Sequence, residues 1–360
     1  IASLFMPAVM GIIADRWIPA QRLLGLCHLF AAGFITLAAT RTDYNSLYTL
    51  VLLSVMFYMP TIALSNSVAY NALEKAGLDT VTHFPPIRVW GTVGFICAMW
   101  VVDLGKMGLS ATQLYFSATL GLILGLYSFT LPNCPINRSG GGKSIVDLLG
   151  LRAFALFKQR KMAIFFIFSM LLGMSLQITN AFADGYIKSF GDTGIHGAKY
   201  LGTFGVEHST ILISLSQISE TLCILLIPFF LKRFGIKRVM LIAMFAWVLR
   251  FALLGAGNPG PGVWMFILSM IVYGVAFDFF NISGSLFVEK ETSAAIRSSA
   301  QGVFMIMTNG LGALIGSYLA GWVVNHYGWP LSWYLFAGFS LVVAIVFAVI
   351  FKYKHDPNRI

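Results

Sequence analysis

The sequence predicts an all-α integral membrane protein, and three observations lead to this fold class. First, 58% of the 360 residues are hydrophobic and only 11% are charged, with a mean hydropathy of +0.81, whereas soluble globular proteins have about 25% charged residues. Second, the hydrophobic residues gather in long runs. Third, lysine and arginine are distributed unevenly over the segments between these runs. Runs of this length fit membrane helices, which satisfy all their backbone groups internally.

Ten apolar runs are long enough to cross a membrane as helices. Each holds about 18 to 27 residues, which suits the roughly 30 Å hydrocarbon core. They occupy residues 23–40, 47–70, 87–104, 111–131, 162–183, 209–230, 238–256, 262–288, 299–324 and 331–351. Residues 1–13 form the end of a further run, so we expect the first helix and part of the second to lie before residue 1. The whole arrangement then has twelve helices.

The positive charges predict the orientation in the membrane. When the connecting segments are assigned alternately to two sides, nineteen of the 24 lysines and arginines fall on one side and four on the other, and Arg250 lies inside a run. Because cytoplasmic loops are enriched in Lys and Arg, we expect the C-terminus to be cytoplasmic. The net charge of +10 therefore reflects membrane topology, and we expect no nucleic-acid partner.

A long basic segment divides the chain. We predict an incomplete N-terminal helical half at 1–132, a cytoplasmic linker with an amphipathic helix at 133–160, a C-terminal six-helix half at 161–352 and a cytoplasmic tail at 353–360. The linker contains the letters S-G-G-G-K-S, but the first glycine of a phosphate-binding loop is replaced by Asn137, and no strand precedes it. The linker interpretation is therefore favoured over ATP binding.

The sequence lacks the residues that several other functions would need. The four cysteines have no spacing typical of a disulfide framework or metal site, and we expect no metal or cofactor. An intramembrane enzyme is disfavoured, because the runs hold no H-E-x-x-H pair. A passive channel is disfavoured too, because it rarely needs two carboxylates within one half of the protein.

A faint repeat relates the two halves. The stretch G-I-I-A-D-R-W ends at Trp17, and P-F-F-L-K-R-F-G-I-K-R ends at Arg238; each closes the second helix of a predicted half. Two parallel halves around a central cavity form a known transporter plan. In the first stretch, Gly11, Asp15 and Arg16 resemble the loop motif of the major facilitator superfamily. This resemblance implies two six-helix halves around a central cavity.

Polar residues inside the runs are candidate site residues, because a charge at the centre of a membrane helix costs roughly 2.5–3.5 kcal/mol on insertion scales. Four clusters have spacings that place their members on one helix face. They comprise Arg88, Thr92 and Phe95; Gln177 and Asn180; Gln217 and Glu220; and Tyr273, Phe277 and Asp278.

Each cluster also has a structural interpretation. Arg88 could anchor its helix at the cytoplasmic edge, and the amides could bond neighbouring helices. Glu220 could pair with an arginine, and a protonated Asp278 could bond a neighbouring helix. Arg250 lies away from the clusters, and for this residue we favour a structural role.

Together the clusters would offer carboxylates, carboxamides and aromatic rings. These groups suit a neutral, polyhydroxylated ligand that carries a flat ring. Burial disfavours the charged form of a carboxyl group, so Asp278 and Glu220 are candidates for proton coupling.

The same residues carry a family resemblance. The stretches P-P-I-R-V-W-G-T-V-G-F, L-Q-I-T-N-A-F, Q-I-S-E-T and V-Y-G-V-A-F-D-F-F-N-I-S-G resemble the bacterial nucleoside:proton symporters of the major facilitator superfamily. The resemblance implies proton-coupled nucleoside import across the bacterial inner membrane, with the ten residues above lining the site. It also implies a monomer whose partners are a nucleoside, the proton and the lipid bilayer. A proton-coupled sugar or oligosaccharide symporter is the alternative.

Overall fold

The computed structural model describes residues 6, 10, 13–14, 17–78, 80–108, 110–135, 156–193, 198–292 and 297–353. Within these residues the regular secondary structure is helical throughout, and all ten predicted runs coincide with helix. The all-α prediction is therefore confirmed. The loop motif of Gly11, Asp15 and Arg16, and most of the predicted linker, lie outside the described residues. The chain forms two compact units, Ile1–Leu149 (unit 1) and Gly150–Ile360 (unit 2).

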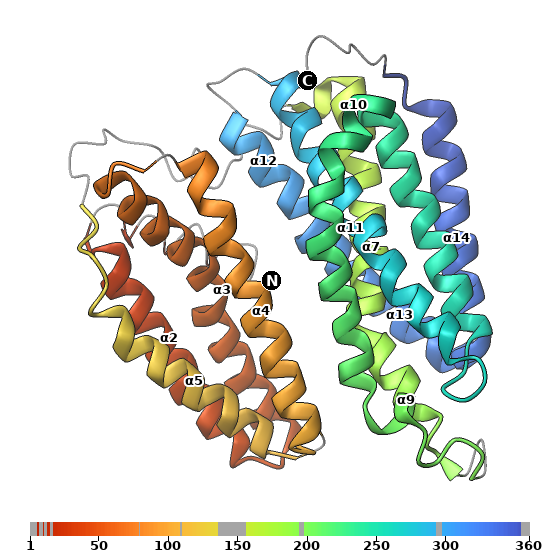
Figure 1. Ribbon diagram of the computed structural model, residues 1–360, viewed down its shortest axis with the longest axis horizontal. Coiled ribbons are helices and arrows are strands. Elements are labelled where there is room, and N and C mark those ends of the chain that lie inside the picture. Colours follow the sequence, from red (N-terminus) through yellow and green to blue (C-terminus); the bar gives the residue numbers. More distant parts are fainter. Residues whose placement is uncertain are drawn as a thin grey trace. The chain divides into compact units, whose positions relative to one another are not determined.

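The described residues of unit 1 form four long helices. They are α2 (Ala20–Ala39), α3 (Tyr44–Lys75), α4 (Thr80–Leu104) and α5 (Thr112–Ser128). Helix α2 packs against both α3 and α5, and α3 also contacts α4 (Figure 1). Asp43 begins α3 as its N-cap and accepts a hydrogen bond from the Ser46 amide at 2.8 Å. Such a cap satisfies a backbone N–H that has no partner within the helix.

The segment after α5 returns to the start of α2. The side chain of Gln21 donates to Asn133 Oδ1 and accepts from the Cys134 amide at 2.9 Å. Lys75, at the end of α3, donates to the Asn133 carbonyl. These bonds join three elements of unit 1 at one end, and the burial that accompanies them raises the pKa of the Cys134 thiol.

The described residues of unit 2 form a larger set of helices. They are α7 (Arg160–Ser189), α9 (Phe204–Glu207), α10 (Ser209–Ala256), α11 (Val263–Glu291), α12 (Arg297–Met305), η2 (Ile306–Gly312), α13 (Ala313–Tyr327) and α14 (Trp329–Ile350). Helix α10 is two helical segments joined at Gly235, whose φ of 76° favours glycine. This break falls between the predicted runs 209–230 and 238–256, as a turn between two membrane helices requires.

The helix that begins with α12 changes geometry in its middle. Residues Ile306–Gly312 form a π-helical segment, η2, between the α-helical turns of α12 and α13. π-helical turns are rare and are frequently found at functional sites. The sequence analysis did not predict this π-helical segment.

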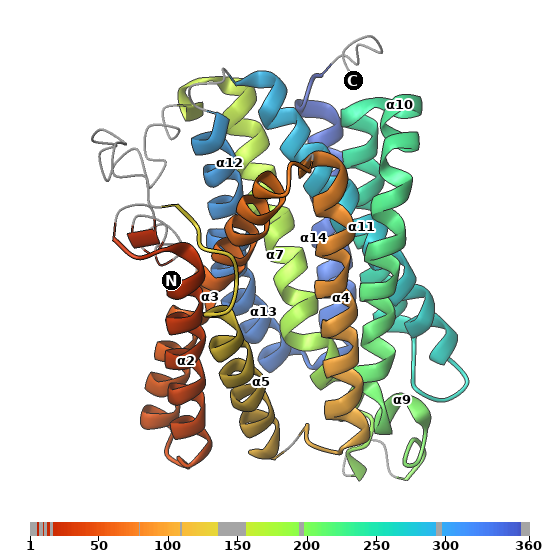
Figure 2. The same cartoon turned by 60° about the vertical axis from the view of Figure 1, so that its left-hand side comes forward.

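Helix α7 packs closely against η2 and α13, and both views show α7 beside α13 (Figures 1 and 2). Three glycines make the approach close: a Cβ at Gly173 would meet the backbone of Thr308, and Cβ atoms at Gly312 and Gly316 would meet the backbone of α7. Small residues commonly let membrane helices approach in this way.

Seven helical stretches within the described residues are long and apolar enough to cross a membrane. One of them, α10, contains two of the predicted runs on either side of Gly235. Two predicted runs fall in shorter apolar helices. The run 87–104 corresponds to the apolar part of α4, Val89–Leu104, and the run 111–131 corresponds to α5, which has 17 residues. The helices therefore agree with a protein that crosses the membrane several times.

Candidate functional site

Unit 1 contributes three of the predicted site residues, all on α4. Thr92 is half-buried, and 54% of Phe95 is exposed. The backbone of Arg88 lies within α4, one turn before Thr92, and the structure describes only this backbone, not the side chain. Because the helix is continuous over these residues, spacings of three and four place them along one face.

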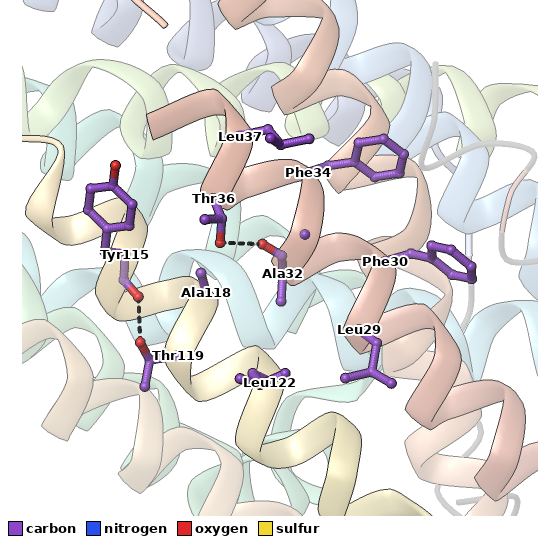
Figure 3. Close-up of a pocket in the computed structure, with 11 residues that line it drawn as sticks. Leu29, Phe30, Ala32, Phe34, Thr36, Leu37, Tyr115, Ala118, Thr119 and Leu122 are labelled. Atoms are coloured by element: carbon purple, nitrogen blue, oxygen red, sulfur yellow. Dashed lines mark hydrogen bonds between the residues drawn. The ribbon is translucent and has the colours of Figure 1, made fainter. Parts of the chain in front are cut away.

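A hollow in the described part of unit 1 lies elsewhere, between α2 and α5 (Figure 3). It has a volume of about 660 Å³, and its walls include Leu29, Phe30 and Leu122. Its threonines are satisfied within their own helices, since Thr36 donates to the Ala32 carbonyl and Thr119 donates to the Tyr115 carbonyl, both at 2.8 Å. None of the ten predicted residues lines this hollow, and its apolar walls do not suit a polyhydroxylated ligand.

Two predicted amides lie on α7 in unit 2. Gln177 is half-buried and Asn180 is exposed. The residues between them, Ile178 and Thr179, are buried at 3% and 4% exposure. Both amides therefore lie on the open side of α7, as their spacing predicts, and are accessible on the surface of unit 2.

Close packing of α10 against α11 aligns the next two clusters. A Cβ at Gly274 would lie 2.6 Å from the Ser219 carbonyl oxygen, so the two backbones are in direct contact there. The Ser219 hydroxyl donates to the Ile271 carbonyl. The half-buried Glu220 follows Ser219 and interacts electrostatically with Tyr273 and Asp278. The structure thus brings together two of the predicted clusters.

Two aromatic residues of the fourth cluster form a stacked pair. The rings of Tyr273 and Phe277 have centroids 5.8 Å apart and planes inclined by 18°. The edge of Trp247 meets Tyr273 at 6.0 Å, and the Arg250 guanidinium lies over the Tyr273 ring at 4.7 Å. Tyr273 is therefore held in place by its neighbours, and the half-buried Phe277 has one ring face supported.

Asp278 is the most deeply buried carboxylate of the predicted site, with 3% of its surface exposed. Its Oδ2 atom is buried and has no hydrogen-bond partner among the described residues. An unsatisfied polar group in such a place has a substantial desolvation cost. A proton or a ligand hydroxyl would provide the missing partner.

Arg250 is 1% exposed and contacts two other helices of unit 2. It donates to the Ser269 carbonyl on α11 and, at 3.5 Å, to Thr179 Oγ1 on α7. The Ser269 hydroxyl in turn donates to the Arg250 carbonyl at 3.1 Å. These contacts agree with the structural role that the sequence favoured for Arg250. Its partners lie far apart in the chain, and the sequence pattern did not indicate them.

Unit 2 also has a hollow, and some of the residues that line it are not among the ten predicted site residues. It is small, with a volume of about 20 Å³. Its lining joins Phe277 to Asn281 on α11 and to Thr308 and Asn309 on η2. The sequence analysis did not select Asn309. The only sequence feature that could have indicated it is that it is a polar residue within the apolar run 299–324.

The described part of unit 2 therefore offers three kinds of group. Asp278 and Glu220 supply carboxyl oxygens, the asparagines and glutamines supply amides with donors and acceptors, and Phe277 supplies a ring face. No group of three or more His, Cys, Asp or Glu residues suited to a metal ion occurs among the described residues. These groups can bind a neutral ligand that has hydroxyls and a flat ring, and can exchange a proton.

Comparison with known proteins adds independent information. A model of the family described as Nucleoside H+ symporter matches residues 1–356. Nucleoside permease NupG of Escherichia coli (strain K12) is 51% identical over 362 residues, which cover 99% of this chain and 86% of that protein. Xanthosine permease of the same organism is 50% identical over 367 residues, covering 100% and 87% respectively.

The fold has an equally similar solved structure. A crystal structure of a mutant of nucleoside transporter NupG matches this chain with a TM-score of 0.92 at 50% sequence identity. The match covers 98% of this chain and 88% of that chain. The similarity therefore extends over both units.

Proposed function

The chain belongs to the nucleoside H+ symporter family, and from this premise we propose which of its residues bind the nucleoside and the proton. It has the major facilitator fold and is a proton-coupled nucleoside transporter, not an enzyme. The direction of transport, the site residues and the membrane orientation are our proposals.

The proposed nucleoside site consists of the ten residues that the sequence singled out. Acceptor-only carboxylates suit ribose hydroxyls, which donate hydrogen bonds, whereas amides suit groups that donate or accept. The ring of Phe277, supported from one side by Tyr273, suits stacking against a nucleobase. Arg88, Thr92 and Phe95 are proposed as the contribution of unit 1, on the resemblance of their stretch to the family.

The observation that carries the proposal is the buried, unpartnered Oδ2 of Asp278, next to a stacked aromatic pair and near Glu220. A carboxyl group in this environment gains most when a proton or a hydroxyl binds, since it has no partner among the described residues to lose. Asp278 and Glu220 are therefore the proposed proton-coupling residues.

The proton gradient can provide the energy for import. Moving one charge across the membrane yields about 2.3 kcal/mol per 100 mV, which is sufficient to concentrate a neutral solute roughly fifty-fold at 298 K. We propose alternating access in the bacterial inner membrane by a monomer with a cytoplasmic C-terminus. The excess of lysine and arginine on one side supports this orientation.

The test is uptake of radiolabelled uridine by bacterial cells that lack their own nucleoside transporters and express the full-length protein. We expect uptake by the wild type, its loss with a protonophore, and its loss in Asp278→Asn, which keeps the shape of the side chain but removes its acid–base function. Glu220→Gln, measured in parallel, reports whether the second carboxyl is needed as well.

Asp43→Asn is the matched control, because it makes the same chemical change at an exposed N-cap where asparagine is equally suitable. It should transport at the wild-type rate. Wild-type activity in Asp278→Asn would refute the role of Asp278. No uridine uptake by a well-expressed wild-type protein would refute nucleoside import and favour the sugar alternative.

A further inference from the structure

The small hollow beside Phe277 is the starting point for a further assignment. Its volume of about 20 Å³ is enough for roughly one water-sized group. Its polar lining residues are Asn281, Asn309 and Thr308, and its other walls are apolar or aromatic, including Leu176 and Phe280. The Thr308 hydroxyl already donates to the Phe304 carbonyl at 2.9 Å, which leaves the two amides. A hollow of this size and lining suits one polar substituent on a flat ring.

The register between α11 and the helix that follows it explains why these asparagines meet Phe277. Gln301 donates to the Ser285 carbonyl at 2.7 Å, and the Ser285 hydroxyl donates to Gln301 at 3.2 Å. The two helices are consecutive and run in opposite directions. Phe277 lies eight residues before Ser285, and Asn309 lies eight residues after Gln301. The two residues are therefore level along the helices.

Asn281 lies on the same stripe of α11 as the aromatic pair. Tyr273, Phe277 and Asn281 follow each other at intervals of four residues, which is one helix face. Asn281 is half-buried. The stripe that begins with the stacked rings therefore continues into an amide at the hollow.

Asn309 reaches the hollow from the π-helical segment η2. Thr308 is buried against α7, where Gly173 leaves room only for its backbone, and Asn309 is exposed beside it. The amide nitrogen of Asn309 donates to Met305 Sδ at 3.8 Å. A thioether is a weak acceptor, so this contact satisfies little of the capacity of the amide.

An amide inside a membrane helix needs polar partners, because lipid provides none. Asn309 lies well within the span Ala300–Tyr327, and Asn281 lies within Val263–Val288. Neither is near the ends of its span, where interfacial water would serve. A polar ligand at the hollow would satisfy both residues.

We propose that Asn281 and Asn309 read the edge of the nucleobase, with one exocyclic oxygen or amino group of the base in the hollow and the ring against Phe277. This assignment rests on the proposed nucleoside site and deepens it. An amide has donors and an acceptor, as the edge of a base has, and paired amide contacts to base edges are a common mode of base recognition. The carboxyl groups of Asp278 and Glu220 are left for the ribose hydroxyls.

The experiment measures initial uptake rates of three nucleosides that share one ribose. They are uridine, with a carbonyl at position 4 of the base; cytidine, with an amino group there; and pyrimidin-2-one riboside, with hydrogen there. The full-length wild type is compared with Asn281→Ala and Asn309→Ala. Asn325→Ala is the matched control, since Asn325 is an exposed asparagine on α13 that does not line the hollow.

We expect the wild type and the control to prefer the 4-substituted nucleosides. In Asn281→Ala and Asn309→Ala the ratio of Vmax/KM for uridine to that for pyrimidin-2-one riboside should fall about 3- to 10-fold, the value of one neutral hydrogen bond. Because this is a ratio between two substrates on the same membranes, the amount of folded protein cancels. If an alanine variant is too weak to assay, Asn281→Ser or Asn309→Ser gives the same ratio with a smaller change in polarity.

Unchanged ratios in the variants at both positions would overturn the assignment while leaving nucleoside transport intact. Absence of uptake of all three nucleosides by the wild type would instead refute the proposed function. A lowered ratio in the Asn325→Ala control as well would also overturn the assignment, because the effect would then not depend on the hollow.

Discussion

Gly173 offers a direct measurement of how much the close packing of α7 against η2 contributes to stability. A Cβ at Gly173 would lie 2.7 Å from the carbonyl carbon of Thr308 and 2.8 Å from its Cα. Optimal contacts between carbon atoms are about 3.5–4.0 Å, so Gly173→Ala requires the two backbones to separate by roughly 1 Å. Backbone atoms cannot rotate away as a side chain can, so the helices themselves must move.

The size of the effect follows from two opposing contributions. Overpacking typically costs about 1–3 kcal/mol, and a contact between two backbones places this variant at about 2–3 kcal/mol. The separation would also loosen the neighbouring contacts of Gly312 and Gly316 with α7. Replacement of glycine by alanine within a helix contributes about 1 kcal/mol in the other direction. We therefore expect a net loss of about 1–2 kcal/mol in the free energy of unfolding.

The same helix provides the control. Gly185 lies in α7, and a Cβ there would meet no atom within 4 Å. Gly185→Ala gains about the same 1 kcal/mol of helix propensity without overpacking. The difference between the two variants thus isolates the overpacking cost, which we expect to be about 2–3 kcal/mol.

The assay is reversible unfolding of the purified full-length protein in mixed micelles as the denaturing detergent is increased, followed by tryptophan fluorescence. The midpoint should move down for Gly173→Ala and slightly up for Gly185→Ala. Equal midpoints for the two variants would refute the reasoning, because they would show that α7 and η2 can separate without cost.

Two further predictions concern contacts that lie away from this packing interface. Arg250→Lys should lower the free energy of unfolding by about 2–3 kcal/mol, because a lysine cannot hold both the Ser269 carbonyl and the face of Tyr273; the same detergent titration measures it, and a wild-type midpoint would contradict it. Hydrogen bonds from the side chain and the amide of Ser46 lower the pKa of Asp43, so its contribution to stability is present at neutral pH and lost as the pH falls through the lowered pKa. Thermal unfolding at several pH values should show Asp43→Ala less stable than the wild type at pH 7 and the difference smaller in strong acid, and a constant difference at all pH values would contradict this.

The helices and the fold class were predictable from the sequence. An uninterrupted apolar run of about 20 residues allows only one regular structure in lipid, so runs such as 331–351 correspond directly to helices such as α14. The turn at Gly235 was indicated by its basic, glycine-containing segment between two runs. Clusters such as Gln217 and Glu220 could be found because charge and amide groups are rare inside such runs.

What the sequence could not indicate depends on contacts between residues far apart in the chain. The partners of Arg250 come from α7 and α11, and no periodicity along α10 encodes them. The π-helical geometry of η2 and the position of Asn309 beside Phe277 likewise occur where α7 packs against a backbone at Gly173. Hydrophobicity and spacing act within one helix and therefore determine which segments enter the membrane and which of their residues are polar. Only the packing of helices decides which polar groups remain without a partner, and these groups are the ones available to a substrate.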